Sequence, residues 1–206
     1  MSMTVLPDKP AEVRGLIRSG QWRGVTAGVS PRFVQANLAI LPKDLAFEFL
    51  LFCQRNPRPC PVLEVIEAGQ VEPALTAPGA DIRTDVPGYR IYENGALTAE
   101  VLTLVDHWRD DLVSFLLGCS FSFESAMTDA GIPLRHQEMG CNVPMYITSI
   151  PTNPAGTFAG PMVVSMRPIK RGQIVRTVQV TSRFPATHGA PIHIGDPTAI
   201  GIKDIS

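Results

Sequence analysis

The chain has 206 residues, a formal net charge of −1, and 45% hydrophobic residues. This size suits one large domain or two small lobes, with enough apolar residues for a sizeable core. The near-zero charge and the lack of a Lys/Arg block argue against a nucleic-acid partner. No apolar run approaches the roughly 18–20 residues of a membrane span, so we expect no membrane partner.

The N-terminus lacks a basic start followed by an apolar stretch, so we predict no signal peptide. The four cysteines are irregularly spaced and form no CxxC pair. This pattern argues against both a disulfide scaffold and a zinc site. We therefore expect a cytoplasmic protein that uses no metal and no other cofactor.

Helical patterns are clearest near the start of the chain. Asp8 is the predicted cap of a first helix, Pro10 suits its first turn, and Gly20 ends it. A second helix is predicted from Asp44 to about Gln54. It ends before the prolines of NPRPCP, which cannot continue a helix.

The signals between these helices and residue 118 are shorter. The segment 25–42 is punctuated by Gly, Ser and Pro, so we predict a loop. Leu63–Ile66 and Tyr89–Tyr92 are predicted strands. Leu97–Trp108 fits either a helix or a strand, and the apolar run LVSFLLG that follows is predicted to be buried.

The second half of the chain begins with a predicted helix over Ser122–Ala130. From residue 145 onward, MYITSI, TFAGPMVVSMRPI, IVRTVQVTSRF and APIHIG are short and β-branched, and a hairpin turn is predicted at Lys170–Gln173. The sequence therefore predicts an α+β fold in two lobes, residues 1–117 and 118–206. The first is expected to be helix-rich and the second strand-rich.

Residues 118–146 combine reactive side chains with Gly and Pro, as functional sites do. Arg135, His136 and Glu138 follow a Gly/Pro turn within this stretch. An Arg beside a His suits a carboxylate substrate, since Arg binds the carboxylate and His moves a proton. A surface Arg-His pair bridged to Glu138 is an equally weighted alternative.

The phrase GCSFSFE predicts a sharp turn that enters a helix. Ser120, Ser122 and the nearby backbone N–H groups can bind an anion there. Plain capping of the helix and a buried, small Cys119 are the structural alternatives. A Cys119 nucleophile paired with His136 is a weaker hypothesis, and the phrase is not a GxSxG elbow.

Two further groups carry candidate side chains. His188 and His193 lie five residues apart, on opposite faces if the segment is a strand, so proton transfer or hydrogen bonding is favoured over metal ligation. Core-edge histidines are the alternative. Arg83 lies between Asp81 and Asp85, where internal ion pairing is favoured over binding of a substrate carboxylate.

Several long phrases carry a family resemblance. FCQRNPRPCPVLEV, DIRTDVPGYR, AGIPLRHQEMGCNVPMY, GPMVVSMRP and HGAPIHIGDPTAIGI resemble, in this order, the hydro-lyase family related to D-glutamate cyclase. The resemblance runs from about Gly20 to the end of the chain. It implies a two-lobed α/β-type fold and the loss of water from D-glutamate to give 5-oxo-D-proline. It also implies that relatives continue beyond the position of Ser206, so we expect a truncated or naturally short form.

The implied reaction assigns roles to the candidate residues. Several arginines could bind the α-carboxylate, and Arg135 or Arg167 is the expected anchor. The substrate ammonium must lose a proton before it attacks the γ-carboxyl group. His136 or Glu138 is the expected base for that step.

The later steps need an oxyanion site and an acid. Backbone N–H groups around Cys119–Ser122, or the amide of Asn142, are expected to stabilise the oxyanion. His188 or His193 is expected to protonate the departing hydroxide. The alternatives are a hydro-lyase acting on another small acid and a non-catalytic protein that binds 5-oxoproline or a similar carboxylate. We also expect a homo-oligomer.

Overall fold

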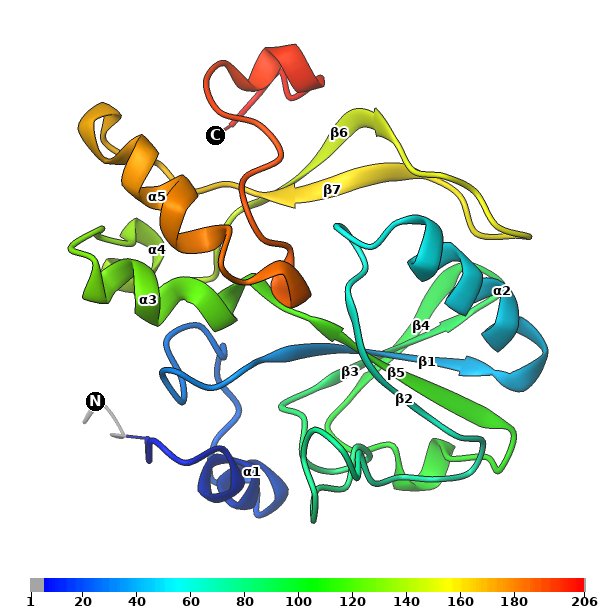
Figure 1. The fold of residues 1–206 in the computed structure, drawn as a ribbon. Helices are drawn as coiled ribbons and strands as arrows, with labels where there is room; N and C mark the ends of the chain where they lie inside the picture. The colour runs from blue at the N-terminus through cyan, green and yellow to red at the C-terminus, as the bar shows by residue number, and fades with distance from the viewer. Residues whose placement is uncertain (1–5, 206) are drawn as a thin grey trace.

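The computed structural model describes residues 6–205 (Figure 1). Its α-helices are α1 Pro10–Arg18, α2 Lys43–Arg55, α3 Glu124–Asp129, α4 Arg135–Glu138 and α5 Ile174–Thr181. Its strands are β1 Ala36–Pro42, β2 Val62–Ile66, β3 Tyr89–Glu93, β4 Ala96–Val101, β5 Leu112–Gly118, β6 Met145–Pro151 and β7 Pro161–Ser165. The predicted α+β class is confirmed.

The central element is an antiparallel sheet with the strand order β1-β5-β2. Strand β5 is the apolar run LVSFLLG, whose residues are mostly buried because a central strand has neighbours on both edges. Its Phe115 is fully buried and meets Phe49 of α2 edge to face, with ring centroids 4.8 Å apart. Helix α2 therefore packs on the middle of this sheet.

The other four strands form two separate hairpins. β3 pairs with β4, and β6 pairs with β7, both antiparallel. The ambiguous segment 97–108 is thus largely strand β4 followed by a 3-10 turn at Val105–His107. In Figure 1, β7 leads into the chain that reaches α5.

A second apolar core lies between α3 and α5. Its buried residues are Phe123, Met127, Ile132, Leu134 and Val180. Gly131 ends the α3 segment with a positive φ of 78°, a conformation that glycine adopts without strain. This core holds together the helices that face the candidate site described below.

Several predicted elements are wrong in type. Segment 25–42 contains strand β1 in place of a loop, and Lys9 is the N-cap of α1 in place of Asp8. IVRTVQVTSRF forms helix α5, and the predicted hairpin at Lys170–Gln173 is a 3-10 turn that enters it. The second half is therefore not strand-rich.

The reason for the error at α5 is a competition between two signals. The β-branched residues favour a strand, but Ile174, Thr177, Val178 and Thr181 recur at the spacing of one helical face. Thr177, Val180 and Thr181 are buried, and Val180 belongs to the α3 core, so tertiary burial decides for the helix. Within residues 6–205, no helix combines the length and apolarity needed to cross a membrane.

Candidate active site

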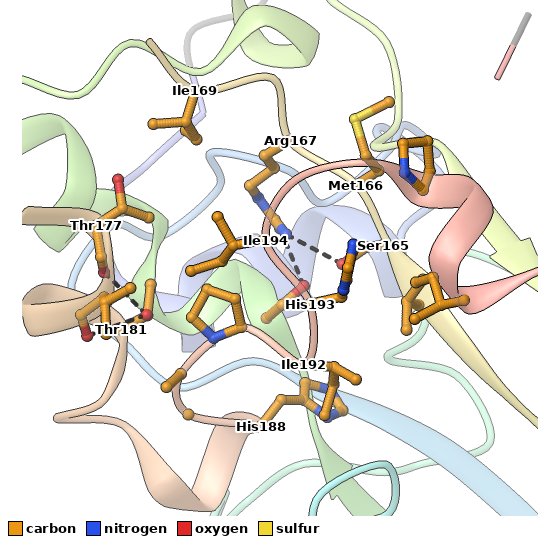
Figure 2. A pocket seen from close by; sticks show the side chains of 18 of the residues that line it. Ser165, Met166, Arg167, Ile169, Thr177, Thr181, His188, Ile192, His193 and Ile194 are labelled. Atoms are coloured by element: carbon orange, nitrogen blue, oxygen red, sulfur yellow. Dashed lines mark hydrogen bonds between the residues drawn. The ribbon is translucent and has the colours of Figure 1, made fainter. Parts of the chain in front are cut away.

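A cavity of about 500 Å³ lies among β7, α3, α5 and the segment 188–195 (Figure 2). Most of its lining is aliphatic or methionine side chains. The polar side chains Ser120, Ser165, Arg167, His188 and His193 interrupt this lining. An apolar cavity with a few polar groups is the usual form of a small-molecule site.

Arg167 is the most firmly held polar residue of the cavity. Its Nε and Nη2 atoms donate to Oε1 of Glu124 at 3.0 and 2.5 Å. Nη2 also donates to the Ser120 hydroxyl, and Nη1 to the Ser165 hydroxyl, each at 3.0 Å. The guanidinium carbon lies 5.3 Å from the centre of the Phe123 ring. These contacts fix the guanidinium in one orientation.

Glu124 is the hub of this network, and it is almost fully buried. Its Oε2 accepts a hydrogen bond from the Gln137 amide at 2.7 Å. The Nε2 atom of buried His136 lies 3.0 Å from Oε1 but is not aligned for a hydrogen bond. A buried carboxylate requires compensation, which Arg167 and Gln137 supply.

Each of the two histidines of the cavity has one ring nitrogen close to a backbone carbonyl oxygen, but the nitrogen differs: Nδ1 in His188 and Nε2 in His193. Nδ1 of His188 lies 2.8 Å from the Arg58 carbonyl oxygen, so Nδ1 is the donor and Nε2 carries the lone pair of the neutral ring. Burial, and then the charge of Arg167, lower the pKa of His188 below its ordinary value of 6.5. Nε2 of His193 lies 2.8 Å from the Asp196 carbonyl oxygen.

The structure brings four of the predicted site residues together: Ser120, Arg167, His188 and His193 line one cavity. The neighbours Arg135, His136 and Glu138 do not form one cluster, because α4 buries His136 and exposes the other two. Asn142 is also exposed, and its side-chain oxygen accepts from the N–H of Val143.

The remaining candidates have structural partners elsewhere. The Ser122 hydroxyl accepts from the N–H of Gln35 at 2.9 Å, which ties this turn to the chain entering β1. Burial raises the pKa of the Cys119 thiol, which disfavours the thiolate that a nucleophile needs. Cys119 also donates its backbone N–H to Gln35.

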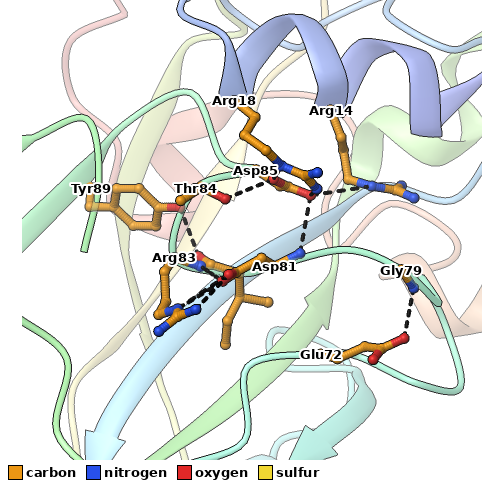
Figure 3. Close-up of polar contacts among 10 residues, drawn as sticks. Arg14, Arg18, Glu72, Gly79, Asp81, Arg83, Thr84, Asp85 and Tyr89 are labelled. Atoms are coloured by element: carbon orange, nitrogen blue, oxygen red, sulfur yellow. Dashed lines mark hydrogen bonds and ion pairs between the residues drawn. The ribbon is translucent and has the colours of Figure 1, made fainter. Parts of the chain in front are cut away.

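Arg83 lies in an ion-pair cluster outside the cavity lining (Figure 3). Its Nη2 is 2.7 Å from Oδ2 of Asp81, as the ion-pairing interpretation expected. Asp85 pairs instead with Arg18, at 2.6 Å. These residues join α1 to the turn before β3.

Sequence reasoning missed Glu124, Ser165 and Arg58. Ser165 precedes Arg167 by two residues, and this spacing places two side chains on the same side of an extended segment. The sequence alone could therefore have paired Ser165 with Arg167. Glu124 contacts Arg167 across 43 residues of chain, a pairing that no local pattern reveals.

Comparison with known proteins agrees with the earlier resemblance. Residues 113–206 match the family model described as D-glutamate cyclase. A "Putative hydro-lyase" of Geobacillus kaustophilus is 61% identical over 199 residues, which are 97% of this chain and 76% of that protein. "Putative hydro-lyase YcsI" of Bacillus subtilis is 61% identical over 196 residues, 95% of this chain and 76% of that protein. A "Putative hydro-lyase" of Stutzerimonas stutzeri is 56% identical over 207 residues, covering all of this chain and 78% of that protein.

The chain belongs to this D-glutamate cyclase family of hydro-lyases. Hydro-lyases are carbon–oxygen lyases, and the chain is an enzyme of that class by family membership.

Proposed function

We propose that the cavity binds D-glutamate and converts it to 5-oxo-D-proline and water. The observation that carries the proposal is the position of Arg167, which Glu124 fixes in a cavity that also holds two imidazole rings. A fixed guanidinium is a preorganised partner for a carboxylate. The histidines supply the acid and base that a dehydration needs.

In this proposal Arg167 and the hydroxyls of Ser120 and Ser165 receive the α-carboxylate. Nε2 of His188 then accepts a proton from the substrate ammonium, which leaves a neutral amine. The depressed pKa of His188 keeps the ring neutral and ready for this step near pH 7. Its hydrogen bond to the Arg58 carbonyl holds the required tautomer.

The amine nitrogen next attacks the γ-carboxyl carbon, so that a C–N bond forms and the ring closes. One C–O bond of that carboxyl group then breaks. The departing oxygen leaves as water with the two protons that the nitrogen has lost. His188 returns the first of them, and His193 takes the second from the nitrogen after the attack and passes it to the same oxygen. The atoms therefore balance without any further reactant.

We propose an oxyanion partner other than those expected from sequence. The N–H groups of Cys119 and Ser122 already donate to the carbonyl oxygens of Gln35 and Cys119, and Asn142 does not line the cavity. The guanidinium of Arg58 does line it. It is the donor that we propose for the tetrahedral intermediate.

Proton NMR of the purified chain with D-glutamate tests this function, with L-glutamate as the matched control. We expect 5-oxoproline signals to grow with the D enantiomer alone. A folded sample that converts neither enantiomer would contradict the proposed reaction. Assembly as a homo-oligomer and a cytoplasmic location stay predictions, and light scattering against the 22.3 kDa mass of one chain tests the first.

A further inference from the structure

Two of the four cysteines lie next to each other. Cys53 is in the last turn of α2, and Cys60 is in the turn that leads from this helix into β2 (Figure 1). The N–H of Asn56 donates to the Cys53 carbonyl oxygen at 3.1 Å, and the N–H of Cys60 donates to the Asn56 carbonyl oxygen at 3.0 Å. The turn therefore folds back on the helix end, where the two thiols are hydrogen-bonded to each other. Both cysteines are free, so they form a dithiol pair.

The turn is held against its surroundings by the buried amide of Asn56. Its Nδ2 donates to the carbonyl oxygens of Phe52 and Asn153, and its Oδ1 accepts from the N–H of Asn153, each at 2.8 Å. Because these bonds tie the turn to α2, the thiols of Cys53 and Cys60 stay close to each other.

The two thiols differ in access and in acidity. Cys53 is 1% exposed, whereas Cys60 is only partly buried. The hydrogen bond from the Cys53 thiol lowers the pKa of Cys60 against the opposing effect of burial, and that bond together with burial raises the pKa of Cys53. The thiolate is the form of cysteine that attacks an oxidant. Cys60 is therefore the thiol that reacts first, and Cys53 is the neighbour that reacts with its product.

We propose that Cys53 and Cys60 are a redox-sensitive pair, which a peroxide converts to a reversible disulfide. The Cys60 thiolate attacks one peroxide oxygen, so that an S–O bond forms, the O–O bond breaks and the released hydroxide leaves as water after protonation. The Cys53 sulfur then attacks the sulfur of the Cys60 sulfenic acid and loses its proton. The S–S bond forms, the S–O bond breaks, and the departing hydroxide takes up that proton. Two thiols thereby give two electrons to the peroxide, which becomes two waters.

The pair lies beside the candidate active site. Arg58 and Pro59 lie between the two cysteines in the chain, and both line the cavity. The Arg58 carbonyl oxygen accepts from Nδ1 of His188, and the Arg58 guanidinium donates to the carbonyl oxygen of Ala190. A disulfide draws two sulfur atoms to about 2.05 Å, closer than unbonded sulfurs can lie, and so shifts this turn relative to His188. We expect the disulfide to slow turnover, and this expectation alone rests on the proposed function.

Tryptic digestion of the 206-residue chain without reductant tests the disulfide. The chain is treated with hydrogen peroxide, and free thiols are then blocked with iodoacetamide. We expect the peptides 44–55 and 56–83 to appear as one linked species, lighter than their sum by two hydrogen atoms, which dithiothreitol separates. The proposal would be overturned if Cys60 stayed a thiol at peroxide concentrations that oxidise the exposed Cys141, or if it were oxidised while Cys53 remained a free thiol.

Two variants assign the roles within the pair. Cys53→Ala removes the second thiol, so we expect Cys60 to accumulate as a sulfenic acid that dimedone traps. Cys141→Ser is the matched control and should still form the linked peptides. A folded Cys53→Ala chain without a dimedone adduct at Cys60 would contradict the role of Cys60, and loss of the link in Cys141→Ser would contradict the pairing.

Turnover of D-glutamate before and after peroxide treatment tests the effect on the cavity. We expect a loss of at least about tenfold in the wild-type chain, as for a displaced catalytic group, which dithiothreitol reverses. Cys60→Ser should keep its own rate after the same treatment. An unchanged rate in a fully linked wild-type sample would overturn the effect on the cavity and leave the disulfide standing.

A second readout separates this inference from the proposed reaction. The ring-proton NMR signals of His188, assigned by their loss in His188→Gln, should shift when the disulfide forms, whether or not D-glutamate is converted. Unchanged signals in a linked sample would overturn the effect on the cavity. A linked sample with shifted signals, from a chain that never converts D-glutamate, would contradict the proposed reaction alone.

Discussion

At the scale of single residues, Glu124 and Arg167 depend on each other. Both side chains are largely buried, at 1% and 10% exposure. Residue type alone identified Arg167 as a carboxylate partner, and the structure gives it a fixed place in a cavity. Glu124 escaped attention because its partners come from β7's end and from α4, far along the chain.

Glu124→Ala removes the counter-charge of a buried guanidinium. We expect the free energy of unfolding to fall by about 3–5 kcal/mol, since an uncompensated buried charge is costly. Urea denaturation measures this change. Glu138→Ala is the control, because Glu138 is exposed on α4 and its loss should change stability by no more than about 0.5 kcal/mol. If Glu124→Ala lowered the free energy of unfolding by less than about 1 kcal/mol, Glu124 would not be the residue that compensates the buried charge of Arg167.

His188 gives the stability a dependence on pH. Its pKa is lowered in the folded chain by burial and by the charge of Arg167, so below pH 6.5 the unfolded chain binds the proton more readily. The contribution of His188 to stability is therefore present above pH 6.5 and is lost as the pH falls through its folded pKa.

His188→Gln should reduce this dependence. We expect the wild-type chain to lose more stability between pH 7.5 and pH 5 than the variant does, in urea denaturation at the two pH values. Carboxylates that titrate in both proteins cancel in the comparison. Equal losses in the two proteins would show that His188 is not held neutral by the fold.

At the scale of elements, local patterns predicted several helices and strands and missed others. Residues 44–54 combine a run of apolar side chains with prolines beyond the end, and both ends of α2 follow from that pattern. Helix α5 was predicted as strand because its β-branched composition outweighed its helical spacing. Strand β1 was missed because its neighbour β5 lies about 75 residues further along the chain, so its pairing is not visible in any short window.

Gly118 joins two elements at close range. It ends β5, and a methyl group at this position would collide with the carbonyl oxygen of Ala186. That residue lies in the 3-10 turn Pro185–Thr187, directly before His188. The close approach of β5 to this turn therefore helps to place the histidine.

Gly118→Ala should lower the free energy of unfolding by about 1–3 kcal/mol, as overpacking does. Thermal or urea denaturation measures the loss. Gly172→Ala is a matched control, because a methyl group there would meet nothing within 4 Å. If the two variants were equally stable, the backbone at Gly118 would not lie in tight contact with the backbone at Ala186.

At the scale of the whole molecule, composition and resemblance predicted the α+β class and the hydro-lyase family, and both are confirmed. The arrangement of the candidate site was only partly predictable. The sequence placed Arg135, His136 and Glu138 side by side, but the short α4 turns them to different environments. The cavity instead gathers residues from α3, β7, α5 and segment 188–195, whose meeting depends on long-range packing.

The central claim is that this cavity, with His188 as base, carries out the dehydration. The most direct measurement is the initial rate of 5-oxoproline formation from D-glutamate by His188→Gln, beside the wild-type chain and Glu138→Gln. We expect His188→Gln to lose at least about 100-fold in kcat, as for the loss of a positioned base, and Glu138→Gln to keep the wild-type rate. Wild-type activity in His188→Gln, or its loss in Glu138→Gln, would contradict the role of His188 as the base in this cavity.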